Sequence, residues 1–210
     1  MTIKAVVFDM DGVLIDAKDW HYEALNRALE LFGFTISRAD HLSTFDGLPT
    51  RRKLEMLTQE RGLPRALHGF LNDMKQQYTT DQVHLKCRPL FVHEFALSNL
   101  KAMGYKLGLG SNSIRSSCEL MMQKSALLPY LDVIVSNEDV ARAKPAPDIY
   151  LKACDALGVP PENCLVVEDN PNGIKAAEDA GCKLLVVNSV HDVQLDRILG
   201  AIARAEEVAP

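Results

Sequence analysis

Short apolar runs rich in β-branched residues recur along the chain, each bounded by polar or turn-forming residues. Runs of this length and composition are typical of strands buried on both faces of a parallel sheet. Segments with helical spacing of apolar residues separate the later runs, such as 147–158, which begins with Pro147 and ends with Gly158. Strands that alternate with helices predict a doubly wound, mostly parallel α/β sheet. The predicted strands are 3–8, 106–110, 132–136, 164–168 and 183–187.

The stretch from residue 17 to residue 84 interrupts this alternation. It contains long amphipathic helical patterns and no run that reads as a strand. We therefore expect an α/β core formed by residues 1–16 and 85–210 and a helical cap domain formed by residues 17–84. Helical domains inserted beside the end of a strand often act as lids over a site. The amphipathic patterns span 18–33, 49–62 and 65–78.

Two aspartates one residue apart follow the first predicted strand, in the sequence VVFDMDGVLID. Residues i and i+2 of a strand point the same way, so Asp9 and Asp11 would repel each other unless a cation lies between them or the chain turns. Polar segments also follow the next three strands: SNS at 111–113, RAKPAPD at 142–148 and EDN at 168–170. The ligand crevice of an open α/β sheet lies outside the carboxyl ends of its strands. We expect convergence there of Asp9, Asp11, Ser111, Lys144, Glu168 and Asp169.

Carboxylates this close together require a hard divalent cation. Mg²⁺, bound through a few oxygens and a phosphate group, is the natural choice. Lys144, Ser111 and the backbone N–H groups of the turn after Asp9 are placed to hold the remaining phosphate oxygens. The pattern therefore favours phosphoryl chemistry assisted by Mg²⁺.

Composition and charge limit the classes of partner. The chain has 210 residues, 47% of them hydrophobic and 24% charged, which is ordinary for a globular protein. Its net charge of −5, without a stripe of Lys and Arg, argues against nucleic acid. No apolar run approaches the roughly 18 residues of a membrane helix, and the first residues are too short an apolar run for a signal peptide. We expect a small-molecule phosphate ester as partner, no membrane, and a monomer or weak oligomer.

The five cysteines are scattered and form no CxxC pair. This spacing favours reduced thiols in the cytoplasm over a disulfide framework or a zinc site. We therefore expect a cytoplasmic protein.

Four motifs together resemble a known family. DMDGVLID, Ser111 with Asn112, KPAPDIYLKA and VVEDNPNGIKAAEDAG are similar, in this order, to the four motifs of the haloacid dehalogenase superfamily, in its capped phosphatase and β-phosphoglucomutase-like branch. The similarity covers nearly the whole chain. Four ordered motifs are far more specific than DxD alone, which also occurs in sugar-nucleotide glycosyltransferases. The resemblance implies an α/β core with a helical cap after the first strand.

The resemblance also implies roles for individual residues. Asp9 is the nucleophile that forms an aspartyl-phosphate, and Asp11 protonates the leaving oxygen and then deprotonates the attacking water. Charge on the transferring phosphoryl group must be stabilised. The implied metal ligands are Asp9, the backbone carbonyl of Asp11, Asp169 and, directly or through water, Glu168; the implied phosphoryl contacts are Ser111 and Lys144.

Further residues are candidates for contact with the rest of the substrate. His21 lies early in the first cap helix, where the family often has histidine, and its alternative role is packing. Lysines and arginines on helices are ordinarily solvated, so the alternative for the basic candidates is an exposed side chain in contact with water. The candidates are Asn112 and Arg115 in the core, and His21, Arg51 and Lys75 in the cap.

The leading functional hypothesis is a Mg²⁺-dependent phosphatase that hydrolyses a small phosphorylated metabolite, such as a sugar or polyol phosphate. The alternative is a sugar phosphomutase similar to β-phosphoglucomutase, which Val13 and His21 permit. The lysine and arginine pattern of that mutase's cap does not align cleanly, since Arg51 and Lys75 each fall about one position off. A non-catalytic phosphate-binding module is a third possibility, but it predicts loss of the nucleophile, and Asp9 is present.

Overall fold

The computed structural model describes residues 2–207 and divides the chain into two compact units. One unit holds the chain up to Asp16 and again from Arg88 onward. The other holds Ala17–Cys87. We call them the α/β unit and the helical unit. Among the described residues, no helix combines the length and apolar character needed to cross a membrane.

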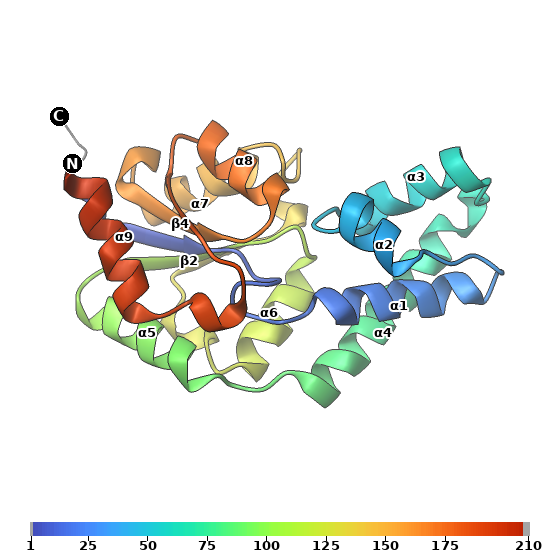
Figure 1. The fold of residues 1–210 in the computed structure, drawn as a ribbon, viewed down its shortest axis with the longest axis horizontal. Helices are drawn as coiled ribbons and strands as arrows, with labels where there is room; N and C mark the ends of the chain where they lie inside the picture. Colours follow the sequence, from blue (N-terminus) through green and yellow to red (C-terminus); the bar gives the residue numbers. More distant parts are fainter. Residues whose placement is uncertain (1, 208–210) are drawn as a thin grey trace. The chain divides into compact units, whose positions relative to one another are not determined.

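The α/β unit is built on a five-stranded sheet in the order β3-β2-β1-β4-β5, with every neighbouring pair parallel (Figure 1). The chain moves outward from the central β1 to β3 and then crosses back to β4, so the topological switch point lies between β1 and β4. The predicted doubly wound sheet is confirmed. Its strands are β1 (Ala5–Phe8), β2 (Lys106–Gly110), β3 (Val133–Val135), β4 (Cys164–Glu168) and β5 (Lys183–Val186).

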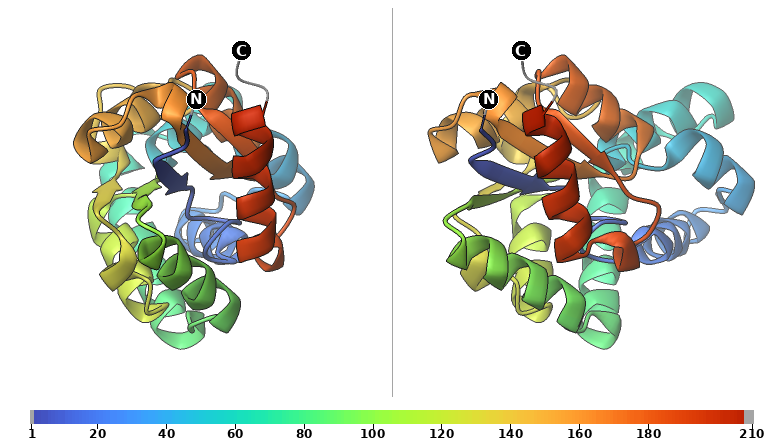
Figure 2. Two further views of the ribbon diagram at one scale, coloured as in Figure 1. Left: turned by 90° about the vertical axis from the view of Figure 1, so that its left-hand side faces the viewer. Right: turned by 60° about the vertical axis from the view of Figure 1, so that its left-hand side comes forward.

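Helices cover both faces of this sheet, as two further views also show (Figure 2). On one face α7 and α8 pack over the strands, and their apolar residues share one buried cluster with Val7 and Val166. On the other face α5 packs against β2 and α9. The continuous apolar runs of β1 and β4 fit this double cover, because both strands are buried throughout. The helices are α5 (Phe91–Ala102), α6 (Arg115–Lys124), α7 (Asp148–Leu157), α8 (Pro171–Asp179) and α9 (Leu195–Glu207).

The helical unit has a hydrophobic core of its own. Its helix α1 packs along α4, and Leu25 and Leu29, spaced at a helical interval on α1, share a buried cluster with Leu54 and Leu57 of α3 and Leu71 of α4. The amphipathic patterns of the sequence are thus helices, as expected. The unit consists of α1 (Lys18–Glu30), α2 (Arg38–Asp40), a π-helical turn (His41–Phe45), α3 (Thr50–Arg61) and α4 (His68–Lys86).

Gly110, the last residue of β2, lets α7 approach the sheet closely. A Cβ atom at this position would lie 2.9 Å from Cγ2 of Ile149 and 3.2 Å from Cε1 of Tyr150. Both side chains are fully buried, so neither can move away freely. The absence of a side chain at Gly110 therefore fixes how close the first turn of α7 comes to β2.

We predict that Gly110→Ala lowers the free energy of unfolding by about 1–3 kcal/mol, because the new methyl group overpacks the contact with α7. Gly200→Ala is the matched control, since a Cβ there, within α9, meets only Arg204 at an ordinary 3.4 Å. That control should be neutral or gain up to about 1 kcal/mol from helix propensity. Urea unfolding followed by circular dichroism measures both; equal stabilities for Gly110→Ala and the parent would contradict the packing argument.

Candidate active site

The predicted polar residues lie at the carboxyl ends of adjacent strands. Asp9 directly follows β1 and extends its ladder, with its N–H donating to the carbonyl of Val167 at 3.0 Å. Ser111 follows β2 in the same way and donates to the carbonyl of Val135 at 2.9 Å. Glu168 is the last residue of β4. Because β1 pairs with both β2 and β4, Asp9 lies between the other two strand ends.

A tight turn separates the two aspartates of the first motif. The carbonyl of Met10 accepts hydrogen bonds from the N–H groups of Leu14 and Ile15 at 3.0 and 2.9 Å, and Gly12 adopts a left-handed φ of 95°. Asp11 has therefore left the strand. Its Oδ2 accepts a hydrogen bond of 3.1 Å from the hydroxyl of Ser113.

The ammonium of Lys144 is the centre of the polar cluster. Its Nζ lies 2.7 Å from Oδ1 of Asp9, 2.7 Å from Oε1 of Glu168 and 2.7 Å from the hydroxyl of Tyr150. An ammonium group has three hydrogens to donate, so these bonds use them all. The Lys144 side chain is only 4% exposed, which makes this a buried ion-pair network in which each partner depends on the others.

Asn112 positions the backbone that carries Lys144. Its side-chain amide donates to the carbonyl of Lys144 at 3.1 Å and accepts from the N–H of Lys144 at 2.9 Å. Asn137 in turn donates to the carbonyl of Asn112 at 2.8 Å. The side-chain amide of Asn112 thus holds the loop that carries Lys144 in place. The predicted contact of Asn112 with substrate stays a prediction.

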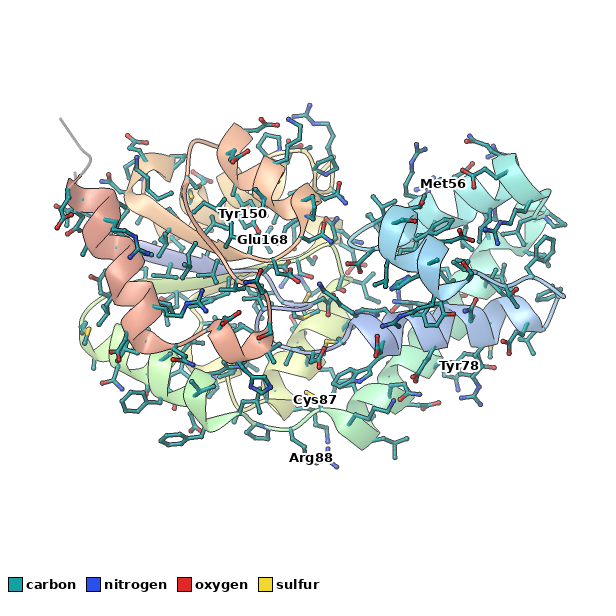
Figure 3. The ribbon with its side chains drawn as sticks, in the orientation of Figure 1. Met56, Tyr78, Cys87, Arg88, Tyr150 and Glu168 are labelled. Atoms are coloured by element: carbon teal, nitrogen blue, oxygen red, sulfur yellow. The ribbon has the colours of Figure 1, made fainter. Side chains whose placement is uncertain are left out.

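Glu168 accepts hydrogen bonds at both of its carboxylate oxygens. Oε1 accepts from Lys144 and from the hydroxyl of Tyr150, each at 2.7 Å, and Oε2 accepts from the N–H groups of Asp169 and Asn170 at 2.9 and 3.1 Å. Figure 3 shows Tyr150 and Glu168 beside each other in the α/β unit. A Cβ atom at Gly173 would lie 1.6 Å from Oε1, so this carboxylate requires glycine there.

The electrostatics of the cluster follow from burial and from its charge balance. Burial raises the pKa of Asp9 well above its usual range, Glu168 raises it further, and Lys144 opposes both. Burial acts against the charge of Lys144, but Asp9 and Glu168 raise its pKa overall. Burial likewise acts against ionised Glu168, yet Lys144 and the hydrogen bond from Tyr150 lower its pKa. One ammonium group therefore pairs with two carboxylates, those of Asp9 and Glu168. A further cation would lower the pKa of Asp9 and so favour its ionised form.

The donor set fits a hard divalent cation. Asp9, Glu168 and Asp169 each offer a carboxylate oxygen, and these oxygens lie within 4.8 Å of one another. Oxygen ligands of this kind suit Mg²⁺. Glu168 already accepts four hydrogen bonds, which favours Asp9 and Asp169 as direct ligands and Glu168 as a group that orients Lys144 and the strand end.

Three residues of the cluster were not predicted from the sequence. Tyr150 bonds Glu168 and Lys144, Ser113 bonds Asp11, and Gly173 makes room for Glu168. Ser113 also donates its N–H to the Ser111 hydroxyl at 3.1 Å. Tyr150 follows Lys144 by six residues, on the buried face of α7. The sequence offered a signal only for Ser113, through its place in the SNS segment.

Arg115 has several partners within the α/β unit. Its guanidinium donates to Asp139 at 2.7 Å and to the carbonyl of Ile134 at 3.1 Å, and it pairs with Glu119 at 3.5 Å. The hydrogen bond that Arg115 donates to the Asp139 carboxylate raises the pKa of the guanidinium. Through these bonds Arg115 ties the start of α6 to β3, and its predicted contact with substrate stays a prediction.

The helical unit contains both buried and exposed basic side chains. Lys75 on α4 is buried and its Nζ donates to Nδ1 of His21 on α1 at 3.1 Å. Arg51 is exposed on the first turn of α3, whereas Lys53 of the same helix is buried. Burial and then the charge of Lys53 lower the pKa of His41 to about 4. Of the three predicted candidates in this unit, two are in contact with each other and Arg51 lies apart at the surface.

Relatives of known activity resemble the chain over most of its length. It is 31% identical over 210 residues to a phosphorylated carbohydrates phosphatase of Thermotoga maritima, covering 98% of this chain and 96% of that protein. It is 29% identical over 206 residues to a validoxylamine A 7′-phosphate phosphatase of Streptomyces hygroscopicus, covering 91% and 88%.

Solved structures share the fold. A β-phosphoglucomutase from Clostridium difficile superposes with a TM-score of 0.84 at 22% identity, covering 98% of this chain and all of that one. CbbY from Rhodobacter sphaeroides, determined with phosphate, gives 0.80 at 23% identity over 88% and 86% of the two chains. The family model described as haloacid dehalogenase-like hydrolase matches residues 6–187. The chain therefore belongs to the haloacid dehalogenase-like hydrolases and is a phosphatase of that family.

Proposed function

We propose that this enzyme is a Mg²⁺-dependent phosphatase that hydrolyses a small phosphorylated metabolite, a sugar or polyol phosphate, through an aspartyl-phosphate on Asp9. The observation that carries the proposal is the convergence of Asp9, Glu168 and Asp169 on one point beside Lys144. The names of the two phosphatase relatives, which act on phosphorylated carbohydrates and on validoxylamine A 7′-phosphate, support a substrate of the sugar class.

Asp9 is the nucleophile in this proposal. Its short side chain stands at the end of the central strand and is held at Oδ1 by Lys144, so the attacking oxygen has a fixed position. An Asp9 oxygen forms a bond to phosphorus while the bond from phosphorus to the ester oxygen breaks. The product is an acyl phosphate, and the alcohol leaves with a proton from another group.

Asp11 supplies that proton and later takes one back. It lies outside the strand, where the turn at Gly12 separates its carboxyl from that of Asp9, and the Ser113 hydroxyl orients it at 3.1 Å. In the first step its carboxylic acid protonates the departing alkoxide. In the second step the carboxylate removes a proton from the water that attacks the acyl phosphate, which releases inorganic phosphate and restores Asp9.

Positive charge must balance the phosphoryl oxygens in both steps. When bound, Mg²⁺ would be held by Asp9, Asp169 and the backbone carbonyl of Asp11, and it would neutralise charge on the phosphoryl group. Lys144 contributes a fixed ammonium, and the buried hydroxyl of Ser111 contributes a donor at the neighbouring strand end. Asn112 keeps Lys144 in place through its backbone.

We further propose that the helical unit is a cap that selects the substrate, with His21, Lys75 and Arg51 as the candidates for contact. The hydrogen bond between Lys75 and His21 gives this unit a preorganised polar pair. We also propose that the protein is cytoplasmic and that it is a monomer or a weak oligomer.

The first experiment measures phosphate release from a panel of sugar, polyol, nucleotide and short-acid phosphates. We expect Mg²⁺-dependent release, fastest from a sugar or polyol phosphate and without a bisphosphate activator. Interconversion of glucose 1-phosphate and glucose 6-phosphate without net phosphate release would instead establish the mutase. Failure to hydrolyse any ester in the panel, or a generic aryl phosphate, would contradict the proposed hydrolysis of small phosphate esters.

A second prediction separates the two aspartates. Asp9→Asn should lower kcat by about 10⁴-fold or more, since it removes the nucleophile, whereas Asp11→Asn should lower it by roughly 10²–10⁴-fold as expected for a lost general acid and base. Asp11→Asn should keep the Mg²⁺ affinity, because that residue offers its backbone carbonyl. Ser113→Ala should have a smaller effect and lower kcat by about tenfold, because it removes one hydrogen bond to Asp11. Steady-state kinetics and Mg²⁺ titration measure these effects; full activity of Asp9→Asn would refute the assignment.

A third prediction concerns Tyr150 and pH. The folded-state pKa of Glu168 is lowered, so its contribution to stability is present above the unfolded-state pKa, about 4.3, and is lost as pH falls through the folded value. Tyr150→Phe removes a hydrogen bond to ionised Glu168 and should cost about 1.5–3 kcal/mol at pH 7. It should also raise the pKa of Glu168, so that acid unfolding begins at a higher pH.

Tyr130→Phe is the control for this experiment. Its hydroxyl donates to Glu94 at 3.3 Å in a less buried position, and the change should leave the free energy of unfolding close to that of the parent. Unfolding by urea is measured from pH 7 down to the acid transition. Equal acid transitions for Tyr150→Phe and the parent would show that the hydroxyl does not stabilise the Glu168 carboxylate.

A further inference from the structure

A second cluster of potential ligands lies in the α/β unit, away from the carboxylates. Cys154, Cys164 and Cys182 place their sulfur atoms within 4.8 Å of one another. Cys154 belongs to α7, Cys164 begins β4, and Cys182 stands directly before β5. The linear spacing of these cysteines favoured separate reduced thiols, but the parallel pairing of β4 with β5 and the packing of α7 bring them together.

The cluster and the proposed active site occupy opposite ends of the same strand. Cys164 is the first residue of β4 and Glu168 is the last. At about 3.3 Å per residue the two lie roughly 13 Å apart. The thiols are therefore separate in space from the groups that take part in the proposed phosphatase mechanism.

One sulfur–sulfur distance in the cluster equals that expected between two thiolates on one tetrahedral metal ion. Sγ of Cys154 and Sγ of Cys182 are 3.8 Å apart. Zinc bound tetrahedrally by thiolates has Zn–S bonds of about 2.3 Å, which places two ligating sulfurs about 3.8 Å from each other. By contrast, the buried Cys118, whose sulfur lies 3.9 Å from the carbonyl oxygen of Ser113, belongs to no such cluster among the described residues.

We propose that Cys154, Cys164 and Cys182 bind a thiophilic divalent cation, with Zn²⁺ as the occupant. Thiolate ligands select soft or borderline metals over Mg²⁺. A divalent ion is favoured over Cu⁺ because the cluster is packed among apolar residues: three thiolates with Zn²⁺ leave one net negative charge, whereas with Cu⁺ they leave two, and buried charge is costly.

The burial of the three residues gives the site an entrance. Cys154 and Cys164 are buried, whereas Cys182 is partly exposed, so an ion can enter beside Cys182 and displace up to three thiol protons to solvent. A tetrahedral ion would take its fourth ligand from water. Once bound, the ion joins α7 to the first residue of β4 and to the segment before β5, and it stabilises the folded chain.

The first test uses Co²⁺ as a spectroscopic probe on the fully reduced protein. One equivalent of Co²⁺ should produce a sulfur-to-cobalt charge-transfer band, which the oxygen ligands of the carboxylate cluster cannot give. Cys182→Ser should weaken or abolish the band, and it is the variant of choice because Cys182 is the least buried of the three. Cys87→Ala, which removes a buried cysteine of the helical unit, is the matched control and should retain the full band.

The second test uses Zn²⁺ itself, in competition with a chromophoric chelator and in thermal unfolding. Loss of an outer partner of a metal ligand already costs about 10- to 100-fold in affinity, so Cys182→Ser should cost about 100-fold or more. Zn²⁺ should raise the Tm of the parent and of Cys87→Ala but not that of Cys182→Ser. Asp9→Asn should give the same sulfur-to-cobalt band as the parent, since its carboxylate offers no sulfur ligand, which separates this site from the proposed phosphatase chemistry.

Three results would overturn the proposal. One is a reduced protein that gives no charge-transfer band with Co²⁺. Another is a band of unchanged intensity in Cys182→Ser. The third is a Cys154–Cys182 disulfide in protein purified without reductant, together with no metal binding after reduction, which would assign the cluster to thiol oxidation.

Discussion

The buried ammonium of Lys144 is the interaction on which the rest of this structure depends. It bonds Asp9 from the central strand and Glu168 from the neighbouring strand, and the hydroxyl of Tyr150 completes its set of partners. Removing the lysine would leave buried carboxylates without a counter-charge, which is far more costly than losing an exposed ion pair. Other features of the unit follow from this requirement: Asn112 fixes the lysine backbone, Gly110 lets α7 bring Tyr150 close, and Gly173 leaves room for Glu168.

The same network explains why two acids can end a buried strand. Asp9 stays in line with β1 and is paired with Lys144, whereas the turn at Gly12 takes Asp11 out of the strand and toward Ser113. Burial raises the pKa of Asp9, Glu168 raises it further, and Lys144 offsets only part of this increase. A divalent cation between Asp9 and Asp169 would complete the balance, and a phosphoryl group would then meet positive charge from two sides.

Much of the fold could be predicted from the sequence, because continuous apolar runs, helical spacing and turn residues are local signals. The strand ends could be located for the same reason, and with them Asp9, Ser111 and Glu168. The roles of Tyr150 and Gly173 could not be predicted, since they depend on which way α7 and α8 face across the sheet. The position of Arg115 after Asn112 predicts a substrate contact, which stays a prediction, whereas its bond to Asp139, 24 residues away in the chain, could not be predicted. The cysteine cluster was hidden for the same reason, because strand pairing creates it.

The central claim is that Asp9 carries the phosphoryl group between substrate and water. The most direct measurement is acid quenching of the enzyme during turnover of a substrate found in the phosphate-release panel, followed by peptide mass spectrometry at low pH. We expect a phosphoryl group on the peptide that contains Asp9, in greater amount in Asp11→Asn, where hydrolysis of the acyl phosphate is slowed. A phosphoryl group on any other residue, or an active enzyme that never becomes phosphorylated, would contradict it.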